Sequence, residues 1–114
     1  MVLEPGEKVH VIKARAFDTD LRRHFIGEVI TATDYAVRLK GYAFILNAGT
    51  NQWIRLPELR TRILSLLDAS VIVNVLPPNA MIDKAIYTIG DDKHLCVTDG
   101  ETFALDINEF GIKQ

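Results

Sequence analysis

Apolar residues recur at every second position in several short segments of this chain, which is the pattern of half-buried β-strands. Val9 and Val11 follow this pattern near the N-terminus, and Phe103, Leu105 and Ile107 follow it near the other end. We predict strands over residues 8–17, 25–33, 35–46, 53–55, 71–76, 85–89, 95–98 and 102–107. Short strands at close intervals, joined by turn residues, are typical of a mainly β protein.

Glycine and proline indicate where these strands bend or end. Gly41 stands inside a predicted strand, where a strongly curved sheet needs a residue without a side chain. Pro77 follows the strand over 71–76 and stops it, because proline has no backbone N–H to donate. Asp99-Gly100 predicts a two-residue type I′ turn, since both central residues of that turn need a positive φ. We therefore expect a small antiparallel barrel with an added C-terminal β-hairpin.

The segment 57–68 fits two interpretations. Four of its apolar residues would share one face of a helix, and Pro57 suits the first helical turn: Leu59, Ile63, Leu66 and Leu67. The alternative is a strand over 60–67 that turns at 68–70 into the next strand. Because Leu, Arg and Glu are good helix formers, we favour one short helix here.

Length and composition indicate one ordinary globular domain, residues 1–114. With 114 residues, 48% hydrophobic and 25% charged, the chain is long enough to bury a core of its own. The single Cys96 excludes an internal disulfide. Because the sequence contains neither a secretory signal pattern nor an apolar run of membrane length, we expect a cytoplasmic protein that does not enter a membrane.

An apolar-x-Gly-x-apolar strand, an acidic turn and an apolar-x-apolar strand follow one another in the chain: Phe25-Ile26-Gly27-Glu28-Val29, Asp34 and Val37-Arg38-Leu39. This order resembles the first signature of the Sm-like family, and residues 62–76 take the place of the second. The resemblance covers about half of the chain and implies an SH3-like or Sm-like barrel, RNA binding and ring assembly. The turn asparagine with which Sm-like proteins contact nucleobases is not matched, because Tyr35-Ala36-Val37 stands there. The resemblance therefore implies a fold and transfers no site.

No catalytic or metal-binding motif stands out in the sequence. His10, His24 and His94 are too far apart to have the spacing of a metal site. Cys96 stands between apolar residues of a predicted strand and reads as a small buried hydrophobe. The acidic residues near the C-terminus fit turns or an outward strand position: Asp91, Asp92, Asp99 and Asp106. We expect no enzyme activity, no cofactor and no metal.

Charge is distributed unevenly, although the formal net charge is only -2. Basic residues concentrate between positions 13 and 62, with aromatic residues among them, and acids dominate after position 80. Positive charge with aromatic rings is the combination that binds single-stranded nucleic acid. We predict a non-catalytic binding or assembly module for RNA or another anionic partner, with these candidate binding residues: Arg22, Arg23, Arg38, Tyr35 and Trp53.

Two other interpretations of the same residues stay open. The basic half also fits a solvated charged rim around a core that contains the aromatic rings, and the sequence favours this interpretation over a binding face. The alternative function is a protein-interaction or regulatory subunit that associates through strand edges. The segments 71–76 and 103–107 contain no obvious protective charge for such edges, so we expect a homo-oligomer.

Overall fold

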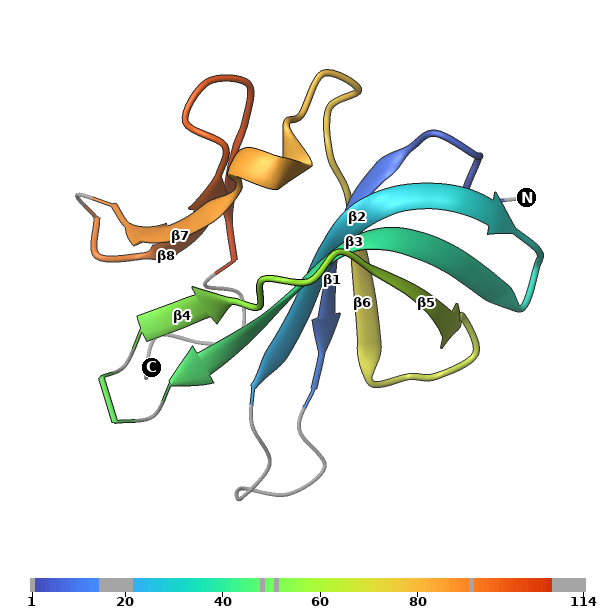
Figure 1. Ribbon diagram of the computed structural model, residues 1–114, viewed down its shortest axis with the longest axis horizontal. Helices are drawn as coiled ribbons and strands as arrows, with labels where there is room; N and C mark the ends of the chain where they lie inside the picture. Colours follow the sequence, from blue (N-terminus) through green and yellow to red (C-terminus); the bar gives the residue numbers. More distant parts are fainter. Residues whose placement is uncertain (1, 15–21, 48, 51, 91, 108–114) are drawn as a thin grey trace.

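The computed structural model describes the chain except for residues 1, 15–21, 48, 51, 91 and 108–114 (Figure 1). Within the described part, the mainly β class is confirmed. The elements in chain order are β1 (Lys8–Lys13), β2 (Arg23–Ala32), β3 (Ala36–Asn47), β4 (Gln52–Arg55), β5 (Arg60–Ser65), β6 (Val71–Val75), the 3₁₀ turn η1 (Ile82–Lys84), β7 (Ile86–Ile89), β8 (Leu95–Thr98) and β9 (Ala104–Asp106). Over these residues no helix is long and apolar enough to span a bilayer.

Six strands form the first sheet, which is antiparallel and strongly curved (Figure 1). Its order is β4-β3-β2-β1-β6, and β5 pairs with the other half of β3. Strand β3 pairs with β2 along one edge, and its other edge is shared by two strands: β5 pairs with residues 36–41 and β4 with residues 44–47. Among the described strands no ladder joins β5 to β6, so the expected barrel is not closed.

Two glycines face each other where β2 and β3 come closest. Gly27 pairs with Gly41. A Cβ atom on Gly41 would lie 2.0 Å from the backbone oxygen of Ile26 and 2.5 Å from the Cα of Gly27. Real Cβ atoms do not come this close to backbone, so the two strands can follow this path only without side chains here.

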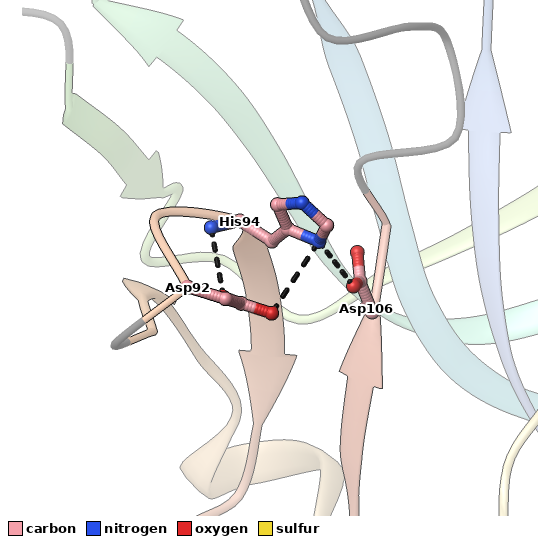
Figure 2. Close-up of side chains that lie close together, drawn as sticks. All are labelled: Asp92, His94 and Asp106. Carbon is pink, nitrogen blue, oxygen red and sulfur yellow. Dashed lines mark hydrogen bonds and ion pairs between the residues drawn. The ribbon is translucent and has the colours of Figure 1, made fainter.

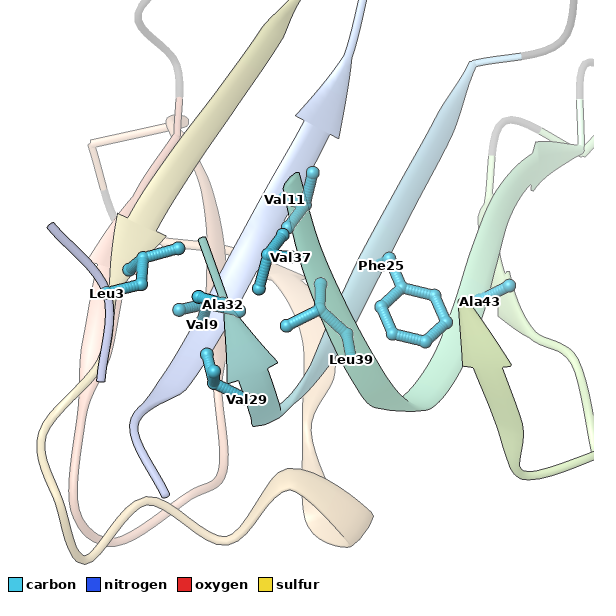
Figure 3. Packing of buried hydrophobic residues seen from close by; sticks show 9 residues of the cluster. All are labelled: Leu3, Val9, Val11, Phe25, Val29, Ala32, Val37, Leu39 and Ala43. Atoms are coloured by element: carbon cyan, nitrogen blue, oxygen red, sulfur yellow. The ribbon is translucent and has the colours of Figure 1, made fainter. Parts of the chain in front are cut away.

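The concave face of the first sheet encloses the larger hydrophobic core (Figure 3). Alternate residues of β1, β2 and β3 point into it, as period-two patterning requires. The buried members are Leu3, Val9, Val11, Phe25, Val29, Ala32, Val37, Leu39 and Ala43. Half-buried residues from β5 and β6 complete the enclosure, among them Leu64 and Val71.

The second sheet, β7-β8-β9, covers part of the opposite face of β2 and β3. Ile26 and Phe44, which are 0% and 2% exposed, point toward it. They pack with residues that follow β6 and with residues of the second sheet: Leu76, Ala80, Ala85, Val97 and Ile107. The middle of β2 and β3 is therefore buried on both faces, which explains why both the inward and the outward positions of these strands contain apolar residues.

The helix expected over 57–68 is wrong, and the alternative strand is confirmed as β5. Its residues alternate between half-buried and exposed positions, as in a strand. Ile63 and Leu67, which the helix would have buried together, are 64% and 72% exposed. Pairing with β3 supplies the backbone hydrogen bonds, so tertiary contacts override the helix propensity of Leu and Arg.

The two-residue turn expected at Asp99-Gly100 is also wrong. Thr98 pairs with Ala104, so the loop has five residues, and Gly100 has a positive φ of 87° whereas Asp99 does not. Asp99 instead organises the longer loop, because its carboxylate accepts hydrogen bonds from the backbone N–H groups of Met81, Glu101 and Thr102. Burial raises the pKa of Asp99, but these bonds and one from the Thr102 hydroxyl outweigh burial and lower it.

We expect Gly41→Ala to destabilise the fold by roughly 2 kcal/mol or more, because the added methyl group meets rigid backbone. Urea unfolding followed by circular dichroism measures this loss. Gly49→Ala is the matched control, since a Cβ there meets only the Asn47 side chain at 3.3 Å. Equal stability of the two variants would contradict the close contact between β2 and β3.

Candidate anion-binding site

A pocket of about 410 Å³ lies at the open side of the curved first sheet, between β2 and β5. Its apolar wall comes from Val11, Phe25, Ile63, Leu64 and Val71. Its polar lining, which gives the pocket a mixed but mainly basic character, consists of Lys13, Arg23, His24, Arg62, Ser65 and Asp68. We call this the guanidinium pocket, after the side chains described next.

The strand alternation of β5 directs two arginines toward this concave side. Arg60 and Arg62 are half-buried on the same face as Leu64, which packs against the larger core. The guanidinium carbon of Arg62 lies 5.6 Å from the ring centroid of Phe25, a cation–π distance. The ring therefore helps to hold this charge at the pocket.

Positive charge accumulates at the pocket with little neutralisation. Burial lowers the pKa of Arg62, and the charges of Arg60 and Arg23 lower it further. Arg60 lies 4.0 Å from the exposed carboxylate of Glu58, and its buried Nε has no hydrogen-bond partner among the described residues. Within the same part of the chain, no ion pair joins Arg23 or Arg62 to an acid. A bound anion would offset this repulsion between like charges.

The acid that lines the pocket is already engaged. Lys13 Nζ donates to Asp68 Oδ2 at 2.6 Å and to Ser70 Oγ at 2.9 Å. The bond from Lys13 lowers the pKa of Asp68, and bonds from Ser70 lower it further. The Lys13–Asp68 pair thus links β1 to the turn before β6 and leaves the arginines as the unneutralised cations of the pocket.

Of the five predicted binding residues, only Arg23 lines the guanidinium pocket. Arg22 lies near Trp53 instead, because its carbonyl accepts the N–H of Leu46, and Leu46 pairs with Trp53. Arg22 and Arg23 are consecutive residues at one end of β2, so their side chains point to opposite faces of the sheet.

Arg38 and Tyr35 lie at the other end of the same strands. Arg38 pairs with Thr31 and Ile63, whereas Arg23 pairs with Ile45. Seven positions of β3 separate these pairings, which is about 23 Å along an extended strand. The structure thus does not bring Arg38 together with Arg22 and Arg23.

Arg60 and Arg62 were not identified as binding residues from the sequence. The signal that points to them is their spacing of two, which places both side chains on one face of a strand. It was masked by the helical interpretation of 57–68, in which residues two apart point in different directions.

A buried polar network joins the two sheets on the opposite face. His10, which is 0% exposed, and His24 lie on β1 and β2, and Tyr87 lies on β7. The hydroxyl oxygen of Tyr87 lies 2.7 Å from His24 Nδ1 and 3.1 Å from His10 Nε2, and the two nitrogens are 3.1 Å apart. Asn74 Nδ2 lies 3.3 Å from His10 Nδ1. Pairing within the first sheet brings His10, His24 and Asn74 together, and the docking of the second sheet adds Tyr87, so separation in sequence hid the network.

The hydrogen-bond geometry fits one arrangement of protons with both histidines neutral. Asn74 donates to His10 Nδ1, so the proton of His10 is on Nε2, which lies 3.1 Å from both the Tyr87 oxygen and His24 Nδ1; the tyrosine hydroxyl donates to His24 Nδ1. Burial lowers the pKa of His10 to about 4. Burial, His10 and Arg22 together lower the pKa of His24 to about 3. The network thus depends on neutral imidazoles.

An exposed group of possible metal ligands lies on the second sheet (Figure 2). One ligand atom from each of Asp92, His94 and Asp106 lies within 4.8 Å of the others. His94 Nδ1 is 2.8 Å from Asp106 Oδ2 and 3.4 Å from Asp92 Oδ2, and the bond to Asp106 raises the pKa of His94. Imidazole and carboxylate ligands suit divalent cations. The same contacts also let His94 satisfy both acids, so the geometry does not require an ion.

The chain was compared with protein-family models, with curated proteins and with solved structures, and none of them matches. The resemblance to the Sm-like family stays a prediction. Function is therefore inferred from the geometry and charge of the chain's own residues.

We expect the free energy of unfolding to fall as the pH drops from about 6.5 toward 4. In the unfolded chain the histidines become protonated near pH 6.5. In the folded protein His10 becomes protonated only near pH 4, and His24 only at a lower pH, so the unfolded state binds more protons between these values. Each excluded proton contributes a slope of at most about 1.4 kcal/mol per pH unit. Urea unfolding at pH 7 and at pH 5 measures the loss.

The variant His24→Gln tests this assignment, because glutamine accepts a hydrogen bond without taking up a proton. It should show a smaller pH slope than the wild type. In the control His94→Asn the slope should be at least as steep, since the raised pKa of His94 acts in the opposite direction. Equal stability of the wild type at the two pH values would exclude the neutral network.

Proposed function

We propose that the protein is a non-catalytic binding module for an anionic partner, with single-stranded RNA as the specific candidate. The observation that carries this proposal is that Arg23 and Arg62 line one pocket and that neither has an acidic partner among the described residues. The charge of Arg60 acts on Arg62 as well, and the acid that lines the pocket, Asp68, is paired with Lys13. Planar guanidinium groups hold phosphate oxygens in a two-pronged geometry that a single ammonium group does not provide.

The free pocket is electrostatically unfavourable. Arg62 is partly withdrawn from water and faces two other positive charges, both of which lower its pKa. The repulsion between these positive charges lowers the free energy of unfolding, and a bound phosphate group would replace it with attraction between opposite charges. This is the arrangement expected of a surface that is completed by its ligand.

The pocket also contains a place for an apolar or aromatic part of the ligand. Phe25, Val11, Leu64 and Val71 line it, and its volume of about 410 Å³ is that of a small-molecule site. Phe25, rather than the predicted Trp53, is the aromatic ring at this position. A nucleotide with its base against the apolar wall and its phosphate at the arginines satisfies both features.

We expect a fluorescein-labelled oligouridylate to bind the wild type in low salt and to dissociate as salt is raised. The double variant Arg23→Gln/Arg62→Gln should bind at least tenfold more weakly. Loss of two phosphate contacts should also reduce the slope of log affinity against log salt by about 1.4. Fluorescence anisotropy at four salt concentrations measures both quantities.

Arg38→Gln is the matched control, because Arg38 alternates with the core residues Val37 and Leu39, so its exposed charge lies on the face of β3 opposite to the pocket. Its affinity should stay within about twofold of the wild type. The proposal fails if the wild type does not bind at low salt, or if Arg38→Gln weakens binding as much as the double variant. Circular dichroism of each variant verifies that the fold is retained.

A second candidate function, association of identical chains through strand edges, is favoured by the open barrel. Among the described strands, β5 pairs only with β3 and β6 only with β1, so each has an edge with free backbone groups. The outward face of β5 and its flanks is also apolar: Leu59, Ile63 and Leu67 are 51%, 64% and 72% exposed. A second copy would cover both features.

Sedimentation velocity is expected to show a dimer or larger assembly of the wild type at micromolar concentration. Ile63→Lys should shift the distribution to monomer, because it places a charge in the apolar face without touching the core. Ile89→Lys is the control, since Ile89 is similarly exposed on the second sheet. A monomeric wild type at high concentration would contradict self-association.

A further inference from the structure

A second cavity, of about 450 Å³, lies between the first and the second sheet, away from the guanidinium pocket. Strand β4 contributes Trp53 and Arg55, and the segment from η1 to β7 forms the facing wall. We call this cavity the aromatic cleft, and it shares no lining residue with the guanidinium pocket.

Three rings form the apolar part of the aromatic cleft. Trp53 and Tyr87 stack at 4.7 Å with 17° between their planes, and Phe44 lies 5.1 Å from Tyr87 in a tilted arrangement. Tyr87 is also held by the polar network with His10 and His24. The rings are therefore fixed before any ligand arrives. Phe44 is only 2% exposed, so the half-buried Trp53 and Tyr87 supply the aromatic surface that a ligand ring can reach.

The rim of the cleft is more positive than negative. Arg55 and Lys84 provide two cations, and Asp83 provides one carboxylate. Arg55 is held in place, because its guanidinium group donates to the carbonyl oxygen of Asp83 and lies 4.7 Å from the ring centroid of Tyr42. Arg22 adds a further positive charge nearby, since it lowers the pKa of His24, whose ring lies 4.2 Å from that of Trp53.

We infer that the aromatic cleft is a second binding site, which takes a small aromatic anion. The aromatic body lies against Phe44, Trp53 and Tyr87, and the phosphate or carboxylate group lies at the rim between Arg55 and Lys84. Apolar walls with a few fixed charged groups are the usual composition of small-molecule sites, and the volume is in their range. An anion lacking a ring would leave the apolar wall in water, and a neutral ring would leave the cations unpaired.

Phenyl phosphate is the probe that tests both parts of this inference. The chain contains one tryptophan, so the indole N–H of Trp53 gives a single, identifiable signal in a ¹H–¹⁵N correlation spectrum. Phenyl phosphate should shift this signal and the Tyr87 amide saturably. Phenol and inorganic phosphate at the same concentrations should each bind at least tenfold more weakly. Equal affinity for either control compound would overturn the assignment of an aromatic anion.

Charge-reversal variants locate the anion. Lys84→Glu should weaken phenyl phosphate binding at least tenfold, whereas Lys40→Glu, which changes the same charge on an exposed part of β3, should leave it unchanged. An unshifted Trp53 signal in the wild type, or equal effects of the two variants, would overturn the inference. The double variant Arg23→Gln/Arg62→Gln should bind phenyl phosphate normally, so failure here and failure of the RNA proposal are distinguishable.

Discussion

The close contact of β2 and β3 at Gly27 and Gly41 is the constraint on which the rest of the structure depends. Without side chains there, the two strands can bend together, and one face of the sheet becomes concave. The curvature lets β3 pair with β5 over its first half and with β4 over its second. The larger core, the guanidinium pocket and the placement of Trp53 all follow from this division of β3.

The side-chain pattern was sufficient to predict most of the strands. Val9 and Val11 alternate with other residues in β1, and β6 is a nearly continuous run of β-branched apolar residues. The pattern failed for β5, where Leu59, Ile63 and Leu67 were interpreted as a buried helical face. These residues are exposed, and the half-buried side of the strand contains Arg60 and Arg62 instead. A local pattern cannot show that an apolar face points outward, since only the pairing with β3 determines which face encloses the core.

For the candidate site, the sequence could predict the kind of residue involved but not which of these residues lie together. The basic charge between positions 13 and 62 indicated arginines, but register decides which of them meet. Arg23 and Arg62 lie on strands that approach across the concavity, whereas Arg38 is far from Arg23 along the sheet and lies on the opposite face of β3 from its core neighbours Val37 and Leu39. The network of His10, His24 and Tyr87 was beyond prediction for the same reason, because its members are separated by up to 77 residues.

That network also determines how the two sheets are oriented. Apolar contacts between Phe44, Val97 and their neighbours tolerate small rotations and slides, because they are not directional. Three polar atoms that are mutually 2.7–3.1 Å apart tolerate very little, since each must keep its donor or acceptor role. Many relative orientations of the two sheets would bury a similar apolar area. The hydrogen-bonded triangle within this otherwise apolar interface is compatible with only one of them, so it selects the docking geometry.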